Sequence, residues 1–336
     1  MGRHVAEDLP DLDRLVDDAC AAIGSDVDAL RIPRLAGVVL GGGYGRGEGG
    51  AREKLESRVG VGERNISDLQ LKSPTPTPTL TLSNDLDFFA VTEANEGDGA
   101  TGPIADALKP VSEKWTAKLG VDVDFAVKTP WRLKHDEERI MVQELVRGYF
   151  DVSGKKGEEM FAHIDLRPAD AIPWMEAARL LMNRGMGMLF AMEGIEKRGA
   201  DFVARNINKC ILGAGDARLV ARHAYAWKAE DRAHALGDTL YSAAIEWKFR
   251  PGSEPVCDWD AAREYWFKAL DEVSGTCDDS RSLRNAARWI VRRHSIGELR
   301  TFGLDPVVRV LDNVGRHLRL CRAPGDTLMR DWMVFN

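Results

Sequence analysis

Two pairs of aspartates share a spacing that places both members of each pair on one face of a strand. Asp85 and Asp87 lie in the run NDLDFFAV, and Asp122 and Asp124 lie in the run VDVDFAV. Side chains two residues apart on a strand point to the same side of a sheet. Carboxylates held together repel one another, whereas a pair of divalent cations needs several hard oxygen ligands at one point. The two pairs therefore predict a site for divalent metal ions.

A glycine-rich segment supplies a complementary feature. The segment GGGYGRGEGG follows directly after the apolar run LAGVVL, so a strand must end there. Backbone N–H groups of consecutive small residues, together with the positive end of a helix that starts there, form a cradle for phosphate. We expect Gly42 and Gly43 to form this cradle and Arg46 to reach a phosphate oxygen. A cradle beside carboxylates suits phosphoryl chemistry with two metal ions, one lowering the pKa of an attacking hydroxyl and one stabilising a leaving pyrophosphate.

The order of these segments resembles the DNA polymerase beta-like nucleotidyltransferase superfamily. The signature of that family is an apolar residue before G-[GS], then D-x-D, then an acidic residue between apolar ones. The matching segments here are GGYGRGE, the run from Asp85 to Asp87, and the run VDF around Asp124. The resemblance spans residues 34 to 128.

The resemblance implies a role for each matching residue. The backbone around Gly42 and Gly43 would hold the triphosphate of a nucleoside triphosphate. Asp85 and Asp87 would ligate two Mg²⁺ ions, with Mn²⁺ as an alternative metal. Asp124 would complete the coordination of the metal on the nucleophile side and help to take the proton of the acceptor.

Two details of the matching segments bear on these roles. The second motif residue is Gly43, where many family members have serine, so a hydroxyl that can contact phosphate is lost. The third carboxylate is either Asp122 or Asp124, because the two face the same way. Asp124 is preferred for the apolar Val123 and Phe125 on either side of it.

Hydrophobic spacing predicts the elements that position these residues. Residues 51–83 end in SPTPTPTLTLS and are expected to form a flexible, extended insertion where the family has a short link. Around this insertion, the pattern predicts helices at 11–23 and 103–118 and strands at 35–40, 84–91 and 121–127. After Pro130 it predicts helices almost without interruption, at 135–149, 170–196, 200–213, 215–249, 258–273, 279–296 and 304–320.

These elements predict an α+β fold with two domains. Residues 1–165 would form a small mixed β-sheet nucleotidyltransferase core with flanking helices. Residues 166–336 would form an all-helical domain that closes the cleft for the nucleotide and the acceptor.

Composition limits the class of protein. The chain has 44% hydrophobic and 29% charged residues, and no apolar run approaches the length of about 20 residues that spans a bilayer. The N-terminus turns acidic where a signal peptide needs an apolar core, so we expect a cytoplasmic protein without a membrane partner. Five scattered cysteines without a C-x-x-C pair are expected to be reduced and mostly in the core. A net charge of −7 argues against nonspecific coating of nucleic acid.

The helical half offers weaker signals. Lys209 lies on a helix that can face the cleft, and similar enzymes often send a lysine from this domain to the triphosphate. Residues 281–330 are rich in arginine with interleaved aromatic residues, which would suit an RNA or nucleotide acceptor, although charged helix faces are usually only solvated. Methionines and glycines between Met182 and Met188 are expected to pack in the core.

The expected reaction is the Mg²⁺-dependent transfer of a nucleoside monophosphate from a nucleoside triphosphate to an acceptor hydroxyl, with release of pyrophosphate. The acceptor would be a small molecule, a protein hydroxyl or an RNA end. The alternative is a nucleotide-binding regulatory or antitoxin-like module with little or no turnover. A nucleic-acid-modifying enzyme that uses the arginine-rich region is a third hypothesis, which a steep salt dependence of RNA binding would reveal.

Overall fold

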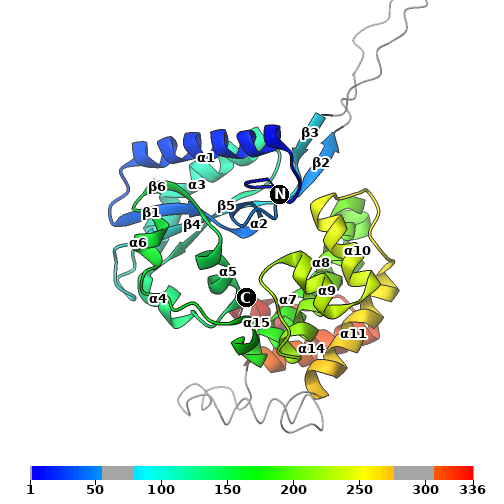
Figure 1. The fold of residues 1–336 in the computed structure, drawn as a ribbon. Coiled ribbons are helices and arrows are strands. Elements are labelled where there is room, and N and C mark those ends of the chain that lie inside the picture. Colours follow the sequence, from blue (N-terminus) through cyan, green and yellow to red (C-terminus); the bar gives the residue numbers. More distant parts are fainter. Residues whose placement is uncertain (1, 55–78, 276–305, 336) are drawn as a thin grey trace, which may run out of the picture.

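The computed structural model describes residues 2–54, 79–275 and 306–335 of the chain. It has an α+β fold with a small mixed sheet and many helices. The sheet and the helices that cover it, which we call the sheet half, come from the residues before Leu166. Figure 1 shows them beside a bundle of helices from the later residues, which we call the helical half.

The sheet has four strands and mixed directions. The strand order is β5 (Val123–Lys128), β4 (Leu86–Thr92), β1 (Leu35–Leu40) and β6 (Phe150–Gly154). β4 and β5 are parallel, whereas β1 is antiparallel to both of its neighbours. β1, β4 and β5 lie where the apolar runs predicted them, because each run is short, rich in apolar residues, and bounded by polar or glycine residues.

Each face of the sheet packs against its own helices, because side chains alternate along the strands. Leu40 and Phe88 belong to the cluster that includes residues of α1 (Pro10–Leu30) and α3 (Thr101–Leu119). Val39 and Phe89 belong to the cluster on the other face. The helices that contribute to that second cluster are α4 (Pro130–His135), α5 (Ile140–Arg147) and α6 (Gly157–Phe161).

The predicted insertion begins and ends in regular structure. β2 (Ala51–Lys54) and β3 (Thr79–Leu82) pair antiparallel and project from the sheet half in Figure 1. The two ends of the insertion predicted at 51–83 are therefore paired strands, because the runs AREK and TLTL satisfy each other's backbone groups. The predicted flexibility concerns residues 55–78, which lie outside the described residues.

The prediction of uninterrupted helices after Pro130 was wrong at β6. The predicted helix at 135–149 is divided between α4 and α5, and the chain then forms β6 on the edge of β1. Phe150 and Val152 alternate with polar residues over too short a run to give a clear strand signal. Pairing with β1, far away in the sequence, decides the conformation, since β-propensity depends strongly on such context.

The helical half is built around two long helices, α7 (Trp174–Lys197) and α8 (Ala200–Ala221). Met182 and Met186 are fully buried, and a Cβ at Gly185 would lie 2.4 Å from Val314. The predicted role of these residues in close helix packing is confirmed. The other helices of this half are α9 (Ala229–Leu236), α10 (Thr239–Phe249), α11 (Trp259–Gly275), α14 (Pro306–Leu320) and α15 (Asp326–Phe335).

The predicted helices at 200–213 and 215–249 have different boundaries in the structure. α8 continues through Gly213, and Gly215 lets the ring of Tyr241 approach, because a Cβ there would lie 2.1 Å from that ring. The second predicted helix is broken at Gly237, which adopts φ +60 and ends α9. Asp238 then accepts a hydrogen bond from the N–H of Tyr241 and caps α10.

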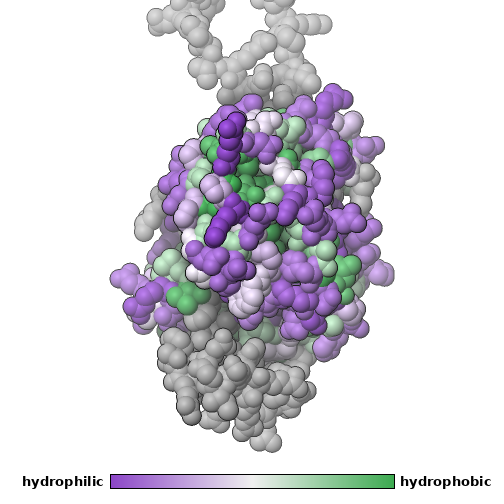
Figure 2. Space-filling model, turned by 90° about the vertical axis from the view of Figure 1, so that its left-hand side faces the viewer, coloured by the Kyte–Doolittle hydropathy of each residue, from purple (hydrophilic) through white to green (hydrophobic). Residues whose placement is uncertain are grey.

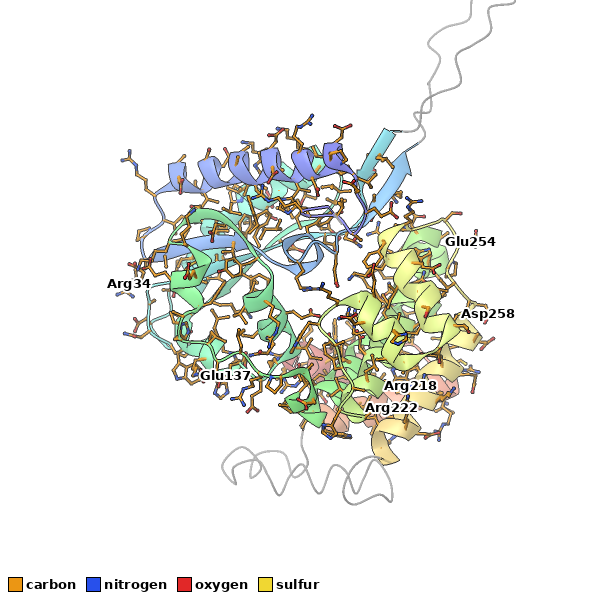
Figure 3. The ribbon with its side chains drawn as sticks, in the orientation of Figure 1. Arg34, Glu137, Arg218, Arg222, Glu254 and Asp258 are labelled. Carbon is orange, nitrogen blue, oxygen red and sulfur yellow. The ribbon has the colours of Figure 1, made fainter. Side chains whose placement is uncertain are left out.

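Two arginines of α8, the buried Arg218 and the exposed Arg222, hold the helical half together internally. Arg218 of α8 lies 3.0 Å from Asp238 and 2.9 Å from Glu272, and Arg222 pairs with the same Glu272. Figure 3 labels Arg218 and Arg222 on this side of the molecule. These contacts tie α8 to α11 and to the cap of α10, so we assign both arginines a structural role.

The surface is mostly polar where it can be seen. Figure 2, which views the left-hand side of Figure 1, shows a face that is mainly hydrophilic, with smaller hydrophobic areas between the hydrophilic residues. Among the helices of the described residues, none has the length and apolar character that a membrane span requires. Of the described cysteines, Cys20 and Cys210 are buried, Cys257 is half-buried and Cys321 is exposed, so the prediction of core cysteines holds for two of them.

Candidate functional site

The sheet brings three of the four aspartates of the sequence motif together. Asp87 is the second residue of β4, and the parallel register with β5 places it directly opposite Asp124. Their neighbours in the strands point to the face that packs against α1 and α3. Asp87 and Asp124 therefore lie on the opposite face, together with Phe89 and Ala126. Asp85 precedes β4 by one residue and shares the face of Asp87.

The electrostatics of Asp87 show how close these carboxylates are. The surrounding protein displaces part of its hydration although its side chain remains open to solvent, and Asp85 and Asp124 add repulsion. Together these effects raise the pKa of Asp87 to about 6. The cluster therefore carries negative charge that the neighbouring cations do not fully compensate.

The pKa of Asp124 bears on the choice between Asp122 and Asp124. Burial, Asp122 and Asp85 all raise the pKa of Asp124 above its usual value. The repulsion acting on Asp87 comes from Asp85 and Asp124. The register of β4 and β5 pairs Asp124 with Asp87 of the D-x-D pair, while Asp122 adds repulsion to Asp124.

The carboxylates do not form a complete metal site in this conformation. Within the described ranges, no group of three or more His, Cys, Asp or Glu residues is arranged to hold a metal ion. Repulsion between like charges favours such a separation of the side chains. Metal binding by Asp85, Asp87 and Asp124 therefore stays a prediction.

The glycine-rich segment packs directly on the aspartate strand. It forms a short helix, α2 (Gly42–Gly45), and the N–H of Gly41 donates a hydrogen bond to the carbonyl oxygen of Asp87 at 2.8 Å. Gly42 adopts φ +59, and a Cβ there would lie 2.3 Å from Asp87 Oδ2. Only glycine fits this position without strain, so the segment is built to approach the carboxylate closely.

The predicted phosphate contacts of this segment are not tested by the structure. The first turn of α2 leaves the N–H groups of Gly42 and Gly43 without intrahelical acceptors. Arg46, in contrast, makes ion pairs to Glu144 at 3.0 Å and to Glu48 at 3.6 Å. Phosphate binding by Gly42, Gly43 and Arg46 stays a prediction.

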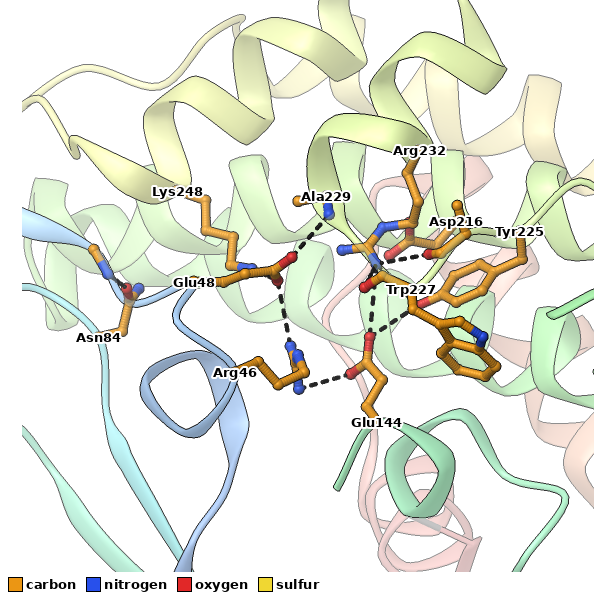
Figure 4. Close-up of polar contacts among 12 residues, drawn as sticks. Arg46, Glu48, Asn84, Glu144, Asp216, Tyr225, Trp227, Ala229, Arg232 and Lys248 are labelled. Atoms are coloured by element: carbon orange, nitrogen blue, oxygen red, sulfur yellow. Dashed lines mark hydrogen bonds and ion pairs between the residues drawn. The ribbon is translucent and has the colours of Figure 1, made fainter. Parts of the chain in front are cut away.

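A buried group of charges joins the two halves, and sequence reasoning missed it (Figure 4). Glu48 accepts a hydrogen bond from the N–H of Ala229 at 2.8 Å and lies 3.1 Å from Lys248 Nζ. Burial alone would raise the pKa of Glu48, but Lys248, Arg232 and Arg46 outweigh it and lower the pKa to about 2. Glu48 is therefore a carboxylate from the sheet half held by cations of both halves.

A second carboxylate of the sheet half extends this group. Glu144 of α5 accepts a hydrogen bond from the hydroxyl of Tyr225 at 2.9 Å and lies 3.7 Å from Arg232. Arg232 in turn pairs with Asp216 of α8 at 3.1 Å. We call the set of these side chains the interface network: Arg46, Glu48, Glu144, Asp216, Tyr225, Arg232 and Lys248.

The sequence carried a signal for only part of the interface network. Arg46 and Glu48 stand out as charged residues within a run of glycines. The partners from α5, α8, α9 and α10 lie on ordinary amphipathic helices, where single charges look solvated. No local pattern distinguishes such residues from a polar surface.

The helical half contributes one of the predicted residues to a pocket beside the aspartates. Lys209 of α8 and Asp85 line the same pocket. Burial and the nearby Arg184 lower the pKa of Lys209, while Asp85 and Asp87 act in the opposite direction. The structure thus places Lys209 near Asp85 and Asp87, whereas triphosphate binding by Lys209 stays a prediction.

In the described part of the arginine-rich C-terminal region, residues 306–330, the arginines make contacts of other kinds. Residues 281–305 lie outside the described residues. Further along, Arg316 pairs with Asp312 on its own helix, and the guanidinium of Arg319 lies 5.2 Å from the ring centre of Phe267. Both arginines therefore have structural contacts in α14.

Comparison with known proteins finds no match to any family model, to any curated protein or to any solved structure. The likeness to nucleotidyltransferases therefore rests on the three motifs and on the arrangement of their residues.

Proposed function

We propose that the chain is a nucleotidyltransferase that moves a nucleoside monophosphate from a nucleoside triphosphate to an acceptor hydroxyl. The observation that carries this proposal is the arrangement of three carboxylates, Asp85, Asp87 and Asp124, against the glycine turn at Gly42. Segments that lie far apart in the sequence meet at one edge of the sheet. Lys209 adds a cation from the helical half.

The carboxylates are of the ligand type that the metal of such a reaction prefers, although in this conformation they are not arranged to hold it. They offer hard oxygen ligands, and desolvation together with the neighbouring Asp85 and Asp124 raises the pKa of Asp87. Asp85, Asp87 and Asp124 would hold Mg²⁺, with Mn²⁺ as an alternative. The bound metal would supply the positive charge that a triphosphate and a leaving pyrophosphate require.

The residues of the chain have separate tasks in this reaction. The backbone of Gly42 and Gly43 would hold phosphate oxygens, and Lys209 would contribute charge from the other wall. Asp124 would accept the proton as the acceptor hydroxyl attacks the α-phosphorus, and pyrophosphate leaves in line with the attack. The contacts of Glu48 to α9 and α10 would hold the helical half in a fixed position against the glycine turn.

A binding module without turnover is the competing proposal. It would keep the nucleotide site for sensing or for regulation of a partner. The repulsion around Asp87 counts against it, because a module that does not transfer phosphoryl groups gains nothing from holding these carboxylates together.

Release of pyrophosphate tests the reaction. Each of the four ribonucleoside triphosphates would be supplied with Mg²⁺ and a cell extract as the source of acceptor. The native chain would be compared with Asp85→Asn/Asp87→Asn, and Asp11→Asn, which changes an exposed aspartate of α1, is the control. We expect release with one or more triphosphates, loss in the double variant and little change in the control. Equal signals from the native chain and the double variant, with nucleotide still bound, would favour the binding module.

A further inference from the structure

The pocket beside Asp85 has a composition of its own. Gly42, Gly43, Asp87 and Asp124 do not line it. It lies between the start of β4, the hairpin strand β2, and the helices α8 and α10. Its charged lining residues are Arg52, Asp85, Asp201, Arg205, Lys209 and Lys248, which makes four cations against two anions.

Within the described residues, only two of the four cations of this pocket form ion pairs. Arg52 pairs with Asp201 at 3.5 Å, and Lys248 pairs with Glu48 at 3.1 Å. Over the part of the chain that the structure describes, Arg205 and Lys209 have neither an ion pair nor a hydrogen bond from their side chains. The two are four residues apart on α8, so like charges lie on one helix face and repel each other. In a chain with a net charge of −7, this surplus of positive charge is local.

The walls around these cations are fixed by buried contacts. Asn208 lies between them in sequence, is buried, and accepts a hydrogen bond from the N–H of Val256 at 3.1 Å. Trp247 Nε1 donates to the carbonyl oxygen of Glu254 at 2.9 Å, which holds the indole in place. The hydroxyl oxygen of Ser83, on the opposite wall, is buried and has no hydrogen-bond partner. A ligand in the pocket would meet an ordered surface.

The lining also has an apolar part. Trp247, Leu212 and Pro251 contribute hydrophobic surface on the helical side. An arginine and a lysine without partners favour a group with two negative charges, and a phosphate monoester carries about −1.5 to −2 at neutral pH. The pocket therefore suits a small molecule that combines a phosphate group with a planar or apolar body.

We propose that this pocket binds the acceptor, and that the acceptor is a small molecule with a phosphate group that Arg205 recognises. This assignment rests on the proposed nucleotidyl transfer. In that reaction the nucleophile approaches the α-phosphorus from the side opposite the leaving pyrophosphate. With the triphosphate on the glycine turn beside Asp87, the pocket is a separate space that borders the carboxylates only at Asp85.

The test uses phenyl phosphate as the probe and phenol as its uncharged counterpart. Binding to the full chain would be measured by calorimetry, alone and with a saturating Mg²⁺ complex of an α,β-methylene nucleoside triphosphate. The variants are Arg205→Ala and the conservative Arg205→Lys. The control is Arg14→Ala, which removes an exposed arginine of α1 far from the pocket.

We expect phenyl phosphate to bind, phenol to bind much more weakly, and the triphosphate analogue to leave phenyl phosphate binding intact. Arg205→Ala should weaken phenyl phosphate binding by about tenfold or more, because a charge-assisted contact is lost. Arg205→Lys should recover part of the affinity, and Arg14→Ala should behave like the native chain. Affinity for the triphosphate analogue should be unchanged in all three variants.

Three results would overturn the proposal. The first is the absence of saturable phenyl phosphate binding, and the second is binding that Arg205→Ala does not weaken. The third is displacement of phenyl phosphate by the triphosphate analogue together with weaker analogue binding in Arg205→Ala, which would assign the pocket to the donor. Failure of the proposed reaction would look different: pyrophosphate release would be absent while phenyl phosphate still bound at Arg205.

Discussion

Asp87 links the local electrostatics of the site to a property that can be measured as a function of pH. Its pKa in the folded chain is about 6, above the value of about 3.9 in an unfolded chain. The folded state therefore binds the proton more tightly, and stability is lost as the pH rises from about 4 to about 6. Because Asp87 is open to solvent, screening limits the effect to about 1 kcal/mol.

Asp87→Asn should consequently stabilise the metal-free chain near pH 7.5 by about 1 kcal/mol, and the gain should disappear below pH 4. Urea unfolding at a series of pH values measures this difference. Saturating Mg²⁺ should shrink the gain, because a bound cation favours the ionised carboxylate of the native chain. If Asp87→Asn is less stable than the native chain at neutral pH, the neighbouring cations already balance the negative charge of Asp87, which would contradict this prediction.

Gly42 is the residue that permits contact between the glycine turn and Asp87. Gly237 makes a matched control, because its φ of +60 equals that of Gly42 within a degree, and no atom would lie within 4 Å of an added Cβ. Alanine at Gly237 should cost only the strain of the left-handed backbone, about 1 kcal/mol. Alanine at Gly42 should cost about 1 kcal/mol more, because its Cβ collides with the carboxylate of Asp87.

Chemical denaturation of Gly42→Ala and Gly237→Ala measures both costs, and pyrophosphate release measures their effect on the reaction. We expect Gly42→Ala to lose most activity, since Asp87 must move, while Gly237→Ala keeps it. Equal stability losses combined with equal activity would mean that the close approach of Gly42 has no functional importance.

Among the elements, α2 with its flanking residues and α10 are joined through a buried charge pair. Glu48 and Lys248 lie 3.1 Å apart, and the side chain of Glu48 is only 9% exposed. Removal of one partner leaves the other buried without compensation, which typically costs about 3 to 5 kcal/mol. The stability of the folded chain should therefore depend strongly on Glu48.

Glu48→Gln should destabilise the chain by about 3 kcal/mol at pH 7. The contribution of Glu48 is present above about pH 4.5 and is lost as the pH falls through about 2, because its folded pKa lies below the unfolded value. Glu113→Gln, which changes an exposed ion pair on α3, is the control and should cost less than about 0.5 kcal/mol. A loss at Glu48 as small as that at Glu113 would show that the interface network does not hold the halves together.

The sequence predicted elements where the signal was local. β1, β4 and β5 are apolar runs with clear ends, and α1 begins at Pro10 with Asp11 and Asp13 in its first turn. β6 was missed because its partner β1 decides its conformation. The boundaries of α8 and α9 were wrong because Gly215 serves packing, whereas Gly237 ends a helix, and the residue type alone does not distinguish these uses.

In the candidate site, too, the residues with a local sequence signal were predicted and those that depend on distant partners were not. The aspartates and the glycine turn were predicted because each motif lies on one strand or turn, and the parallel register then brings Asp87 to Asp124. The interface network and the cationic pocket depend on helices from the other half of the chain. Their residues have no fixed spacing from the motifs, so only the packed structure reveals them.

For the whole molecule, the two halves contribute different groups to the candidate site. The sheet half carries the carboxylates and the glycine turn, while the helical half supplies Lys209 and the cations of the pocket. The interface network fixes the helices of one half against the turn of the other (Figure 4). Reaction and substrate binding would both depend on this contact.

The most direct test of nucleotidyl transfer is the fate of the phosphorus atoms of the donor. Nucleoside triphosphates with a radioactive label at the α or the γ position would be incubated with the chain, Mg²⁺ and a cell extract. We expect the α label in an acceptor product and the γ label in pyrophosphate, with both signals lost in Asp85→Asn/Asp87→Asn. Transfer of the γ label to an acceptor, or turnover that survives the double substitution, would contradict nucleotidyl transfer at these carboxylates.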